Sequence, residues 1–484
     1  IVDVASPHDH DNVICRWHKA DAETLDKAVQ ASQKAYKDWS NQAPHVRMSV
    51  MEKAANLLAG PWRDTVNAAT MLGQSKTCYQ AEIDSACELI DFYRLNNWMA
   101  LDKIYTEQPT STPDTWNYVD HRPLEGFVCA ITPFNFTSIA GNLPTAPALM
   151  GNVVLWKPSK GSMLSNYYIM KMLEEAGMPP GVINFVPCRP SAMADSVFGS
   201  EHFSGLHFTG STAVFQKIWL QTAENLAKYR TYPRIVGETG GKDFIFVHES
   251  ADLDALVVAA LRGAYEFQGQ KCSAASRMYV PDTLWPEFRD RLVAEITKIK
   301  MGDPADFSNF MCAVIDKAAY SDITGYVDKA KAGAKILAGG GYDDRKGWFV
   351  EPTLVECEDP RFITMEEEIF GPVLSVHVYK ADKLDDALEL CDTTSPYALT
   401  GAVFAQDRGM AERIGTRLRH AAGNFYINDK PTGAVVNQQP FGGARASGTD
   451  DKAGGPQNLM RWIAPRSVKE NFLPPKSWEY PHME

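Results

Sequence analysis

The spacing of apolar residues indicates a helical first part of the chain. Between residues 21 and 40, "DAETLDKAVQASQKAYKDWS" places Leu25, Val29 and Trp39 on one helical face, with Asp21 as a candidate N-cap. Segments 49–60 and 80–100 continue this pattern. We therefore expect the first hundred residues to be helical, with these apolar residues in the core.

From residue 126 onward, short apolar runs of strand length alternate with helical patterns. Alternation of this kind predicts βαβ units, in which a parallel sheet carries helices on both faces. The expected strands are 126–132, 152–159, 183–187, 206–211, 243–250 and 276–280, and the expected helices are 162–180, 212–227 and a helix from 252 toward Cys272. The second series starts near Gly237 and continues to about Ile427. The fold class is therefore α/β, with two α/β domains in series.

The segment 105–126 interrupts these patterns. It reads "YTEQPTSTPDTWNYVDHRPLEG" and is rich in Pro, Thr and Asp, with traces of extended structure. We interpret it as a protruding hairpin or linker that contacts another subunit.

Composition and charge limit the partners. The 484 residues are 45% hydrophobic and carry a net charge of -12, which argues against a nucleic acid or an anionic membrane as partner. No apolar run reaches the roughly 18 residues of a spanning helix. The nine cysteines are scattered without a Cys-x-x-Cys pair, so we expect a reducing compartment and neither disulfides nor a metal site. "HDHD" at His8–Asp11 is interpreted as a solvated loop. The first residue is Ile, so any targeting segment would lie upstream.

Three residues are candidates for catalysis. Cys272, in "GQKCSAAS", is either a reactive nucleophile or a small, half-buried apolar residue. Asn135, in "TPFNF", is either a donor to an oxyanion or a turn residue. Glu238, in "GETGGKDF", is either a general base with a raised pKa or a surface glutamate.

Other motifs suit a dinucleotide, although the chain lacks Gly-x-Gly-x-x-Gly. "FTGST" offers the backbone N–H groups of a helix start at Gly210–Ser211 to an anion, or is an ordinary N-cap. Lys157 in "WKPS" and Glu368 in "EEEIFGPV" suit ribose hydroxyls, although Glu368 also fits an ordinary helix end. The Gly-rich loop 432–456 allows close approach to a ligand or is a flexible surface loop.

Taken together and in order, these motifs resemble the aldehyde dehydrogenase superfamily along nearly the whole chain. The resemblance rests on "TPFNF", "LWKPS", "FTGS", "GETGGK", "GQKC", "EEIFGPV" and "PFGG". The segments "AEIDSACELIDFYR" and "AAGNFYINDKPTGAVVNQQPFGGARASGT" are similar to the branch that oxidises glutamate semialdehyde derived from 1-pyrroline-5-carboxylate, in proline catabolism.

The resemblance implies a fold of two Rossmann-like α/β domains and a small oligomerisation flap. The implied boundaries are 1–104 and 123–237 for the dinucleotide-binding domain, 105–122 and 465–484 for the flap, and 238–464 for the catalytic domain. It further implies a homodimer or dimer-based hexamer, in the mitochondrial matrix of a eukaryote or otherwise in the cytoplasm.

The resemblance also assigns roles to residues. Cys272 would form a thiohemiacetal and then a thioester, Asn135 would hold the oxyanion, and Glu238 would activate water. The implied NAD-binding residues are Thr132, Lys157, Ser159, Gly210, Ser211, Thr212, Ala213, Val214, Glu368 and Phe370. For the substrate, Gly433, Ala434 and Ser273 would bind the α-carboxylate, and Phe441, Tyr93 and Glu88 would surround the aliphatic chain.

Some positions depart from the usual family pattern. Tyr93 stands where Phe is usual, Thr239 replaces a Cys common in eukaryotic relatives, Asp243 replaces a frequent Asn, and Lys160 stands where an acidic residue often favours NAD, so NADP stays open as an alternative. Tyr93 also keeps open another semialdehyde as substrate. Glu238 argues against a CoA-acylating enzyme, and the presence of all three catalytic candidates argues against a non-catalytic binding protein.

Overall fold

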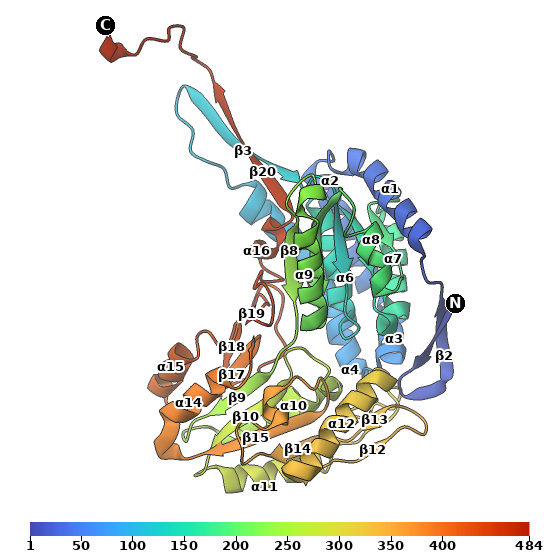
Figure 1. Ribbon diagram of the computed structural model, residues 1–484, viewed down its shortest axis with the longest axis vertical. Coiled ribbons are helices and arrows are strands. Elements are labelled where there is room, and N and C mark those ends of the chain that lie inside the picture. The colour runs from blue at the N-terminus through green and yellow to red at the C-terminus, as the bar shows by residue number, and fades with distance from the viewer. Residues whose placement is uncertain (484) are drawn as a thin grey trace.

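The computed structural model describes residues 1–483, the side chains of 194 and 195 excepted, and contains two α/β units (Figure 1). The first is built on a five-stranded parallel sheet in the order β6-β5-β4-β7-β8. Its strands are β4 (Phe127–Ile131), β5 (Val153–Lys157), β6 (Ile183–Phe185), β7 (Phe203–Thr209) and β8 (Arg234–Glu238). The expected parallel sheet is thus confirmed.

Helices cover both faces of this first sheet. Alternate strand residues face opposite ways: Val128 and Ala130 enter one apolar core, and Phe127 and Cys129 enter the other. The helices are α1 (Ala22–Trp39), α2 (Pro44–Ala59), α3 (Arg63–Gln74), α4 (Cys78–Ala81), α5 (Leu89–Met99), α6 (Thr137–Leu149), α7 (Met163–Ala176), α8 (Met193–Ser196) and α9 (Thr212–Glu224), with 3-10 turns η3 (Lys160–Ser162), η4 (Pro190–Ala192) and η5 (Leu226–Lys228). Asp21 caps α1 as predicted, because its carboxylate accepts from the Thr24 N–H at 2.9 Å.

The second unit is built on a seven-stranded sheet in the order β11-β14-β15-β10-β9-β17-β18, parallel except for the pair β11–β14. Its strands are β9 (Asp243–Val247), β10 (Ala275–Pro281), β11 (Lys335–Ala338), β14 (Thr353–Glu356), β15 (Val373–Tyr379), β17 (Thr400–Phe404) and β18 (Asn424–Ile427). The helical elements around it are α10 (Leu253–Tyr265), η6 (Glu266–Gly269), α11 (Trp285–Ile296), α12 (Lys317–Gly333), α13 (Ile363–Glu366), η7 (Ala381–Lys383), α14 (Leu384–Thr393) and α15 (Arg408–Arg417). Short pairs β12 (Tyr342–Asp343) with β13 (Phe349–Val350), and β16 (Tyr397–Ala398) with β19 (Ala444–Arg445), complete the unit.

The N-terminal segment departs from the prediction of a wholly helical first hundred residues. β1 (Val2–Ser6) and β2 (Asp9–Trp17) form an antiparallel pair that precedes Asp21, where the helical spacing of apolar residues begins. His8 is not a solvated loop residue: it is 4% exposed and its Nδ1 lies 3.1 Å from the Ser75 hydroxyl. Two π-helical segments, η1 (Glu82–Glu88) and η2 (Ala100–Tyr105), flank α5. The sequence pattern did not predict this wider helical winding.

A two-stranded arm extends away from both units (Figure 1). β3 (Thr115–Pro123) pairs antiparallel with β20 (Ile463–Asn471), so the expected protruding hairpin is made by two strands distant in sequence. The C-terminal segment continues beyond it with η8 (Pro481–Met483). Just before β20, α16 (Pro456–Met460) returns the chain to the first unit, where Leu459 and Trp462 join its core.

Candidate active site

A strained turn delivers Cys272 to the carboxyl end of the first sheet. Phe267 and Gln268 adopt left-handed conformations with φ of 51° and 57°, which non-glycine residues rarely do. The Gln268 side chain stabilises this turn by donating to the carbonyls of Ser75 at 3.0 Å and Ala313 at 2.8 Å. Strain of this type persists only where surrounding contacts hold it, and it clusters at functional sites.

Asn135 reaches this turn from the other unit. It follows β4, is 3% exposed, and its Nδ2 donates to the Gln270 carbonyl at 3.1 Å. A side-chain amide carries two N–H bonds, so one remains for another acceptor. The bond to Gln270 also fixes the orientation of the amide, because only the nitrogen can donate to a carbonyl.

The segment from Glu238 to Gly241 passes between the two units and packs against the cysteine. Glu238 ends β8, and its carbonyl accepts from the Gly210 N–H at 3.2 Å. A Cβ atom on Gly241 would lie 2.3 Å from the Cys272 carbonyl oxygen. Glycine is therefore required at this position for the close approach of the two backbones.

Burial and neighbouring carboxyl groups keep the Cys272 thiol protonated. Desolvation raises the pKa of Cys272 well above its ordinary value, and Glu238, Asp243 and Glu368 raise it further. Desolvation also raises the pKa of Glu238 to about 8, and that of Glu368 to about 6. The Cys272 thiol must therefore lose a proton before it can attack a carbonyl group. The pKa of Glu238, at about 8, suits a general base near neutral pH.

Three predicted cofactor residues lie at the carboxyl ends of β4 and β5, where parallel sheets bind ligands. Thr132 accepts from the Trp156 indole N–H at 3.0 Å, and its own N–H donates to the Lys157 carbonyl at 3.2 Å. Within residues 1–483, the only hydrogen bond of the Lys157 ammonium is a 3.4 Å contact with the neighbouring Pro158 carbonyl. Half-buried and weakly bound, this ammonium suits the hydroxyls of a ribose. Ser159 follows on the same loop.

The start of α9 has the chemistry of a pyrophosphate site. Ser211 is the N-cap residue but its side chain makes no capping bond, and Ala213 and Val214 lie in the first turn, where the Val214 side chain is exposed. The N–H groups at this helix start are therefore open to an anion. Thr212 has a different role, because its hydroxyl donates to the Ala446 carbonyl at 3.3 Å and accepts from the Gly240 N–H at 3.2 Å.

Glu368 and Phe370 face the same region from the second unit. Glu368 accepts from the Gly241 N–H at 2.8 Å, which joins it to the segment that packs on Cys272. Phe370 has a φ of 55° and makes an edge contact with Phe134 at a centroid distance of 5.8 Å. Both Phe residues line a cavity of about 290 Å³ between the units, together with Ser159, Lys160, Gly161, Ile315, Asp316, Ala319, Asp322 and Ile369.

The residues predicted to bind substrate fall into two groups. Ser273 lies 2.8 Å from the Thr432 hydroxyl, which ties the cysteine segment to the loop that carries Gly433 and Ala434. Gly433 has a φ of 95°, a conformation that favours glycine. Phe441 is held on the same loop by paired backbone bonds with Ala453 at 2.8 Å.

Glu88 and Tyr93 form the second group, on η1 and α5. Glu88 accepts from the Ser138 hydroxyl at 2.9 Å, and burial together with Asp84 raises its pKa to about 8. Tyr93 is 1% exposed inside the first core, and its hydroxyl has no hydrogen-bond partner among residues 1–483. The substrate roles of both residues stay predictions.

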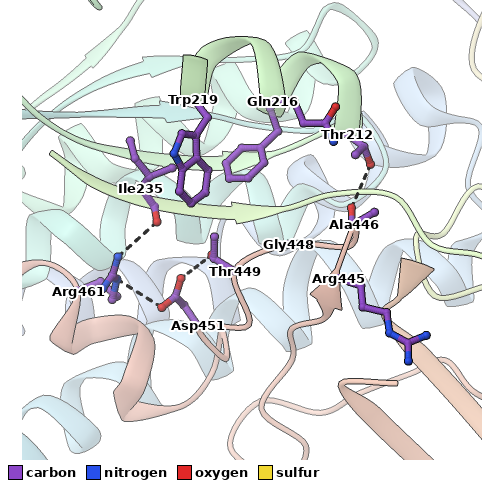
Figure 2. Close-up of a pocket in the computed structure, with 11 residues that line it drawn as sticks. Thr212, Gln216, Trp219, Ile235, Arg445, Ala446, Gly448, Thr449, Asp451 and Arg461 are labelled. Carbon is purple, nitrogen blue, oxygen red and sulfur yellow. Dashed lines mark hydrogen bonds and ion pairs between the residues drawn. The ribbon is translucent and has the colours of Figure 1, made fainter. Parts of the chain in front are cut away.

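Cys272 does not line a larger pocket of about 560 Å³, which Figure 2 shows. The pocket is formed by α9, β8 and the loop after β19, and Figure 2 shows Arg461 directed toward Asp451 and the Ile235 carbonyl. Of the predicted site residues only Thr212 lines it. The pocket with the larger volume and the predicted catalytic residues around Cys272 therefore lie at different places.

Two residues of the site were missed by sequence reasoning. Gln270 lies within the quoted motif "GQKC", but nothing in the sequence assigned its carbonyl to Asn135. Gln268, which holds the strained turn, had only its place in the same segment as a signal. In the part of the chain that the structure describes, no cluster of three His, Cys, Asp or Glu side chains has the arrangement of a metal site, and no helix has the length and apolarity to span a bilayer.

The fold and this site define a dehydrogenase of aldehydes, and the comparisons agree. The chain belongs to the aldehyde dehydrogenase family, whose profile matches residues 1–468. It is 52% identical over 479 residues to the mitochondrial delta-1-pyrroline-5-carboxylate dehydrogenase of Dictyostelium discoideum, and the match covers 98% of this chain and 86% of the relative. It is 50% identical over 482 residues to the human mitochondrial protein of the same name, covering 99% of this chain and 85% of the relative.

A solved structure shows the same fold. The delta-pyrroline-5-carboxylate dehydrogenase of Mycobacterium tuberculosis, crystallised with NAD, superposes with a TM-score of 0.96 at 50% identity, covering 100% of this chain and 89% of that one. The comparisons confirm the family and the fold class that the sequence motifs predicted.

Proposed function

We propose that this protein oxidises L-glutamate γ-semialdehyde, the open form of 1-pyrroline-5-carboxylate, to L-glutamate with NAD as electron acceptor, in proline catabolism. The relatives that align with nearly the full chain are named for this activity. The observation that carries the proposal is the bond from the Asn135 amide to the Gln270 carbonyl, because it places a buried donor beside the Cys272 turn.

The first half of the reaction forms a bond between the Cys272 sulfur and the aldehyde carbon. The Cys272 thiol loses its proton to water, the sulfur electron pair forms the bond to the aldehyde carbon, and the carbonyl π electrons move to the oxygen. The remaining Asn135 N–H and the Cys272 backbone N–H donate to that oxyanion. NAD, when bound, accepts the hydride from the tetrahedral carbon, and the chain then carries a thioester on Cys272.

The second half hydrolyses the thioester. Glu238 takes a proton from water, the water oxygen bonds to the thioester carbon, and the C–S bond breaks to release the carboxylic acid and the Cys272 thiolate. Because the pKa of Glu238 is about 8, ionised Glu238 is present in a fraction of molecules near neutral pH.

We assign the cofactor residues to polar groups of the site that are free to bind a ligand. Lys157 and Ser159 would bind one ribose, Glu368 and Phe370 would lie at the other, and the α9 start from Gly210 to Val214 would hold the pyrophosphate. Thr132 completes this edge of the sheet. Lys160, on the cavity wall with Ser159, leaves NADP as the alternative acceptor.

Substrate selection is assigned to the loop that carries Gly433 and Ala434. Their N–H groups and the Ser273 hydroxyl would bind the α-carboxylate, because burying a carboxylate without donors costs several kcal/mol. Phe441, Tyr93 and Glu88 would surround the aliphatic chain. The unpartnered Tyr93 hydroxyl is the observation that favours a second candidate, the same chemistry on another semialdehyde.

Three further assignments belong to this proposal. The dinucleotide-binding domain comprises 1–104 and 123–237, the flap 105–122 and 465–484, and the catalytic domain 238–464. The arm formed by β3 and β20 makes a homodimer or dimer-based hexamer. In a eukaryote, the protein would work in the mitochondrial matrix, as the names of the eukaryotic relatives suggest.

The test is NADH formation, followed by absorbance, with glutamate semialdehyde beside succinate semialdehyde, and with NADP in parallel. We expect glutamate semialdehyde and NAD to give the highest kcat/KM. Cys272→Ala should abolish NADH formation and keep dinucleotide binding. Turnover by that variant would overturn the mechanism, and preference for another aldehyde would move the substrate assignment to the second candidate.

A further inference from the structure

A buried ion pair lies beneath the candidate active site. Lys76, between α3 and α4, and Asp84, in η1, are each 1% exposed, and the Lys76 ammonium lies 2.6 Å from the Asp84 carboxylate. Burial lowers the pKa of Lys76, and Asp84 opposes that shift. Desolvating two charges costs several kcal/mol per ion, so such a pair adds little net stability. Its position in the fold therefore calls for another explanation.

Asp84 binds the backbone that follows Asn135. One carboxylate oxygen accepts from the Thr137 N–H at 3.0 Å, and the other accepts from the Ser138 N–H at 3.0 Å and hydroxyl at 2.8 Å. These two N–H groups are the first of α6, a helix with no capping side chain of its own. Asp84 thus serves as a remote cap, and it fixes the chain two residues after Asn135.

Lys76 contacts both sides of the site. Its ammonium lies 4.3 Å from the centroid of the Phe136 ring and 4.5 Å from that of Phe267. Phe136 follows Asn135 directly, and Phe267 belongs to the strained turn that leads to Cys272. Cation–π contacts of a desolvated ammonium are among the stronger of their type. The Lys76 ammonium therefore contacts both the segment that carries Asn135 and the turn that leads to Cys272.

The residue before Lys76 strengthens this connection. The Ser75 carbonyl accepts from Gln268 at 3.0 Å, and the Ser75 hydroxyl accepts from the Ala313 N–H at 3.2 Å. Gln268 is the second left-handed residue of the cysteine turn. The short segment 75–76 is thus bonded to the turn through the backbone as well as through the ring of Phe267.

We propose that Lys76 and Asp84 are positioning residues that set the separation of the Asn135 amide from the Cys272 turn. They touch neither substrate nor cofactor; they act through Asn135 and the turn. The proposal rests on the proposed function, since the separation matters only if Cys272 and Asn135 act on one carbonyl. A misplacement of about 1 Å between reacting groups can cost roughly 100-fold in rate.

The variants separate positioning from stability. Lys76→Met and Asp84→Asn each remove one charge, and the double variant removes both, so that neither partner leaves the other as an uncompensated charge in the interior. The matched control is Arg47→Met. Arg47 is also buried, at 3% exposure, and donates to the Leu149 carbonyl at 2.9 Å, at the opposite end of α6. It secures the same helix without contact with the site.

The readout is the rate of the first NADH burst in single-turnover mixing, beside NAD affinity, melting temperature and the rate of Cys272 alkylation by iodoacetamide. We expect the double variant to melt higher than either single variant and yet to form NADH about 10- to 100-fold more slowly than wild type. NAD affinity and alkylation should change less than about threefold. Arg47→Met should lower the melting temperature and keep the burst rate.

Two results would overturn the proposal: a wild-type burst rate in the folded double variant, or an equal loss of burst rate in Arg47→Met. Absence of NADH from the wild-type protein with every aldehyde would instead reject the proposed function. Hydrogen exchange of the wild-type protein needs no variant at all. The Thr137 and Ser138 amides should exchange more slowly than those of Thr212 and Ala213, at the uncapped start of α9. Equal or faster exchange would show that Asp84 is no cap and would reject the proposal even if no variant folds.

Discussion

The side-chain amide of Asn135 donates to the backbone carbonyl of Gln270 at 3.1 Å, across the boundary between the two α/β units. Gln270 lies two residues before Cys272. The bond therefore determines both the distance and the orientation of the amide relative to Cys272. It also leaves one N–H of the amide for the oxygen of a bound aldehyde.

Replacement of Asn135 by Asp tests this geometry. An ionised carboxylate has no N–H to donate and would repel both the Gln270 carbonyl and an oxyanion. We expect the rate of NADH formation to fall about 10²- to 10³-fold, the usual loss for one oxyanion donor. The measurement is single-turnover absorbance. NAD affinity is the control, since the predicted cofactor residues are unchanged. A variant with a near-wild-type rate would remove Asn135 from the oxyanion site.

Replacement of Glu238 by Gln separates the two half-reactions. Without a base to activate water, the variant should release a burst of NADH and then stall as a thioester, with a steady-state rate lower by about 10²-fold or more. Mass spectrometry of the quenched protein would detect the acyl group on Cys272. A full steady-state rate would exclude Glu238 as the base for deacylation.

The pKa of Glu238 predicts a pH dependence. A carboxyl group with a pKa of about 8 is mostly protonated below that pH and mostly ionised above it. Only the ionised form accepts a proton from water, so the rate of thioester hydrolysis should rise as pH increases through about 8. Single-turnover hydrolysis measured from about pH 6 to pH 9 checks this. The rise should be absent in Glu238→Gln, and a flat profile for the wild-type protein would contradict it.

The sequence predicted the parts of this protein that local patterns determine. The strands β4, β5, β6, β7, β9 and β10 and the helices α7, α9 and α10 follow from runs of buried apolar residues such as Phe127–Ile131, because a parallel sheet covered on both faces needs them. The strand β8 and the helix α6 were not predicted. The motifs around Cys272, Asn135 and Glu238 also identified the candidate site from local sequence. Each is a short contiguous stretch of unusual composition.

The sequence did not predict features that depend on contacts between distant segments. The pairing of β3 with β20 joins residues far apart in the chain, and the local pattern of neither strand indicates it. Only the family resemblance placed 105–122 and 465–484 in one flap. The left-handed conformation of Phe267 is imposed by tertiary contacts, against the local preference of an aromatic residue. Lys76 lies in the unremarkable stretch "GQSKTCYQ", and only the fold brings it beneath the active site.

The contact of Gly241 with Cys272 gives a prediction on backbone fit. A methyl group at position 241 would lie 2.3 Å from the Cys272 carbonyl oxygen and 2.5 Å from the Asp243 carboxyl, so Gly241→Ala must displace Cys272. We expect a loss of at least about 100-fold in kcat.

Gly325→Ala is the matched control for this prediction. Gly325 lies in α12, and a Cβ atom added there would meet no atom of a neighbouring segment within 4 Å, so the variant should keep full activity. It should also gain up to about 1 kcal/mol in the free energy of unfolding, because alanine favours a helix. Activity is measured by NADH formation and stability by denaturant unfolding. Full activity in Gly241→Ala would show that the two backbones adjust without cost.

For Tyr93 and Tyr265, we expect removal of the hydroxyl to change the free energy of unfolding in opposite directions. Both are fully buried, but the Tyr93 hydroxyl has no partner among residues 1–483, whereas the Tyr265 hydroxyl donates to the Thr353 carbonyl at 3.2 Å. A buried hydroxyl without a partner carries a desolvation cost, so Tyr93→Phe should raise the free energy of unfolding by about 1 kcal/mol. Tyr265→Phe should lower it by a similar amount. Denaturant unfolding of the empty protein gives both values.

The same variant tests whether the Tyr93 hydroxyl selects the substrate. If the ring alone flanks the aliphatic chain, Tyr93→Phe keeps that wall, and kcat/KM for glutamate semialdehyde should change by less than about threefold. A large shift of kcat/KM toward another semialdehyde would show that the hydroxyl finds its partner in the substrate. In that case the free energy of unfolding would still rise, because the hydroxyl is unpaired in the empty protein. The unfolding and kinetic measurements together would show whether the hydroxyl affects only the stability of the core or also recognises the substrate.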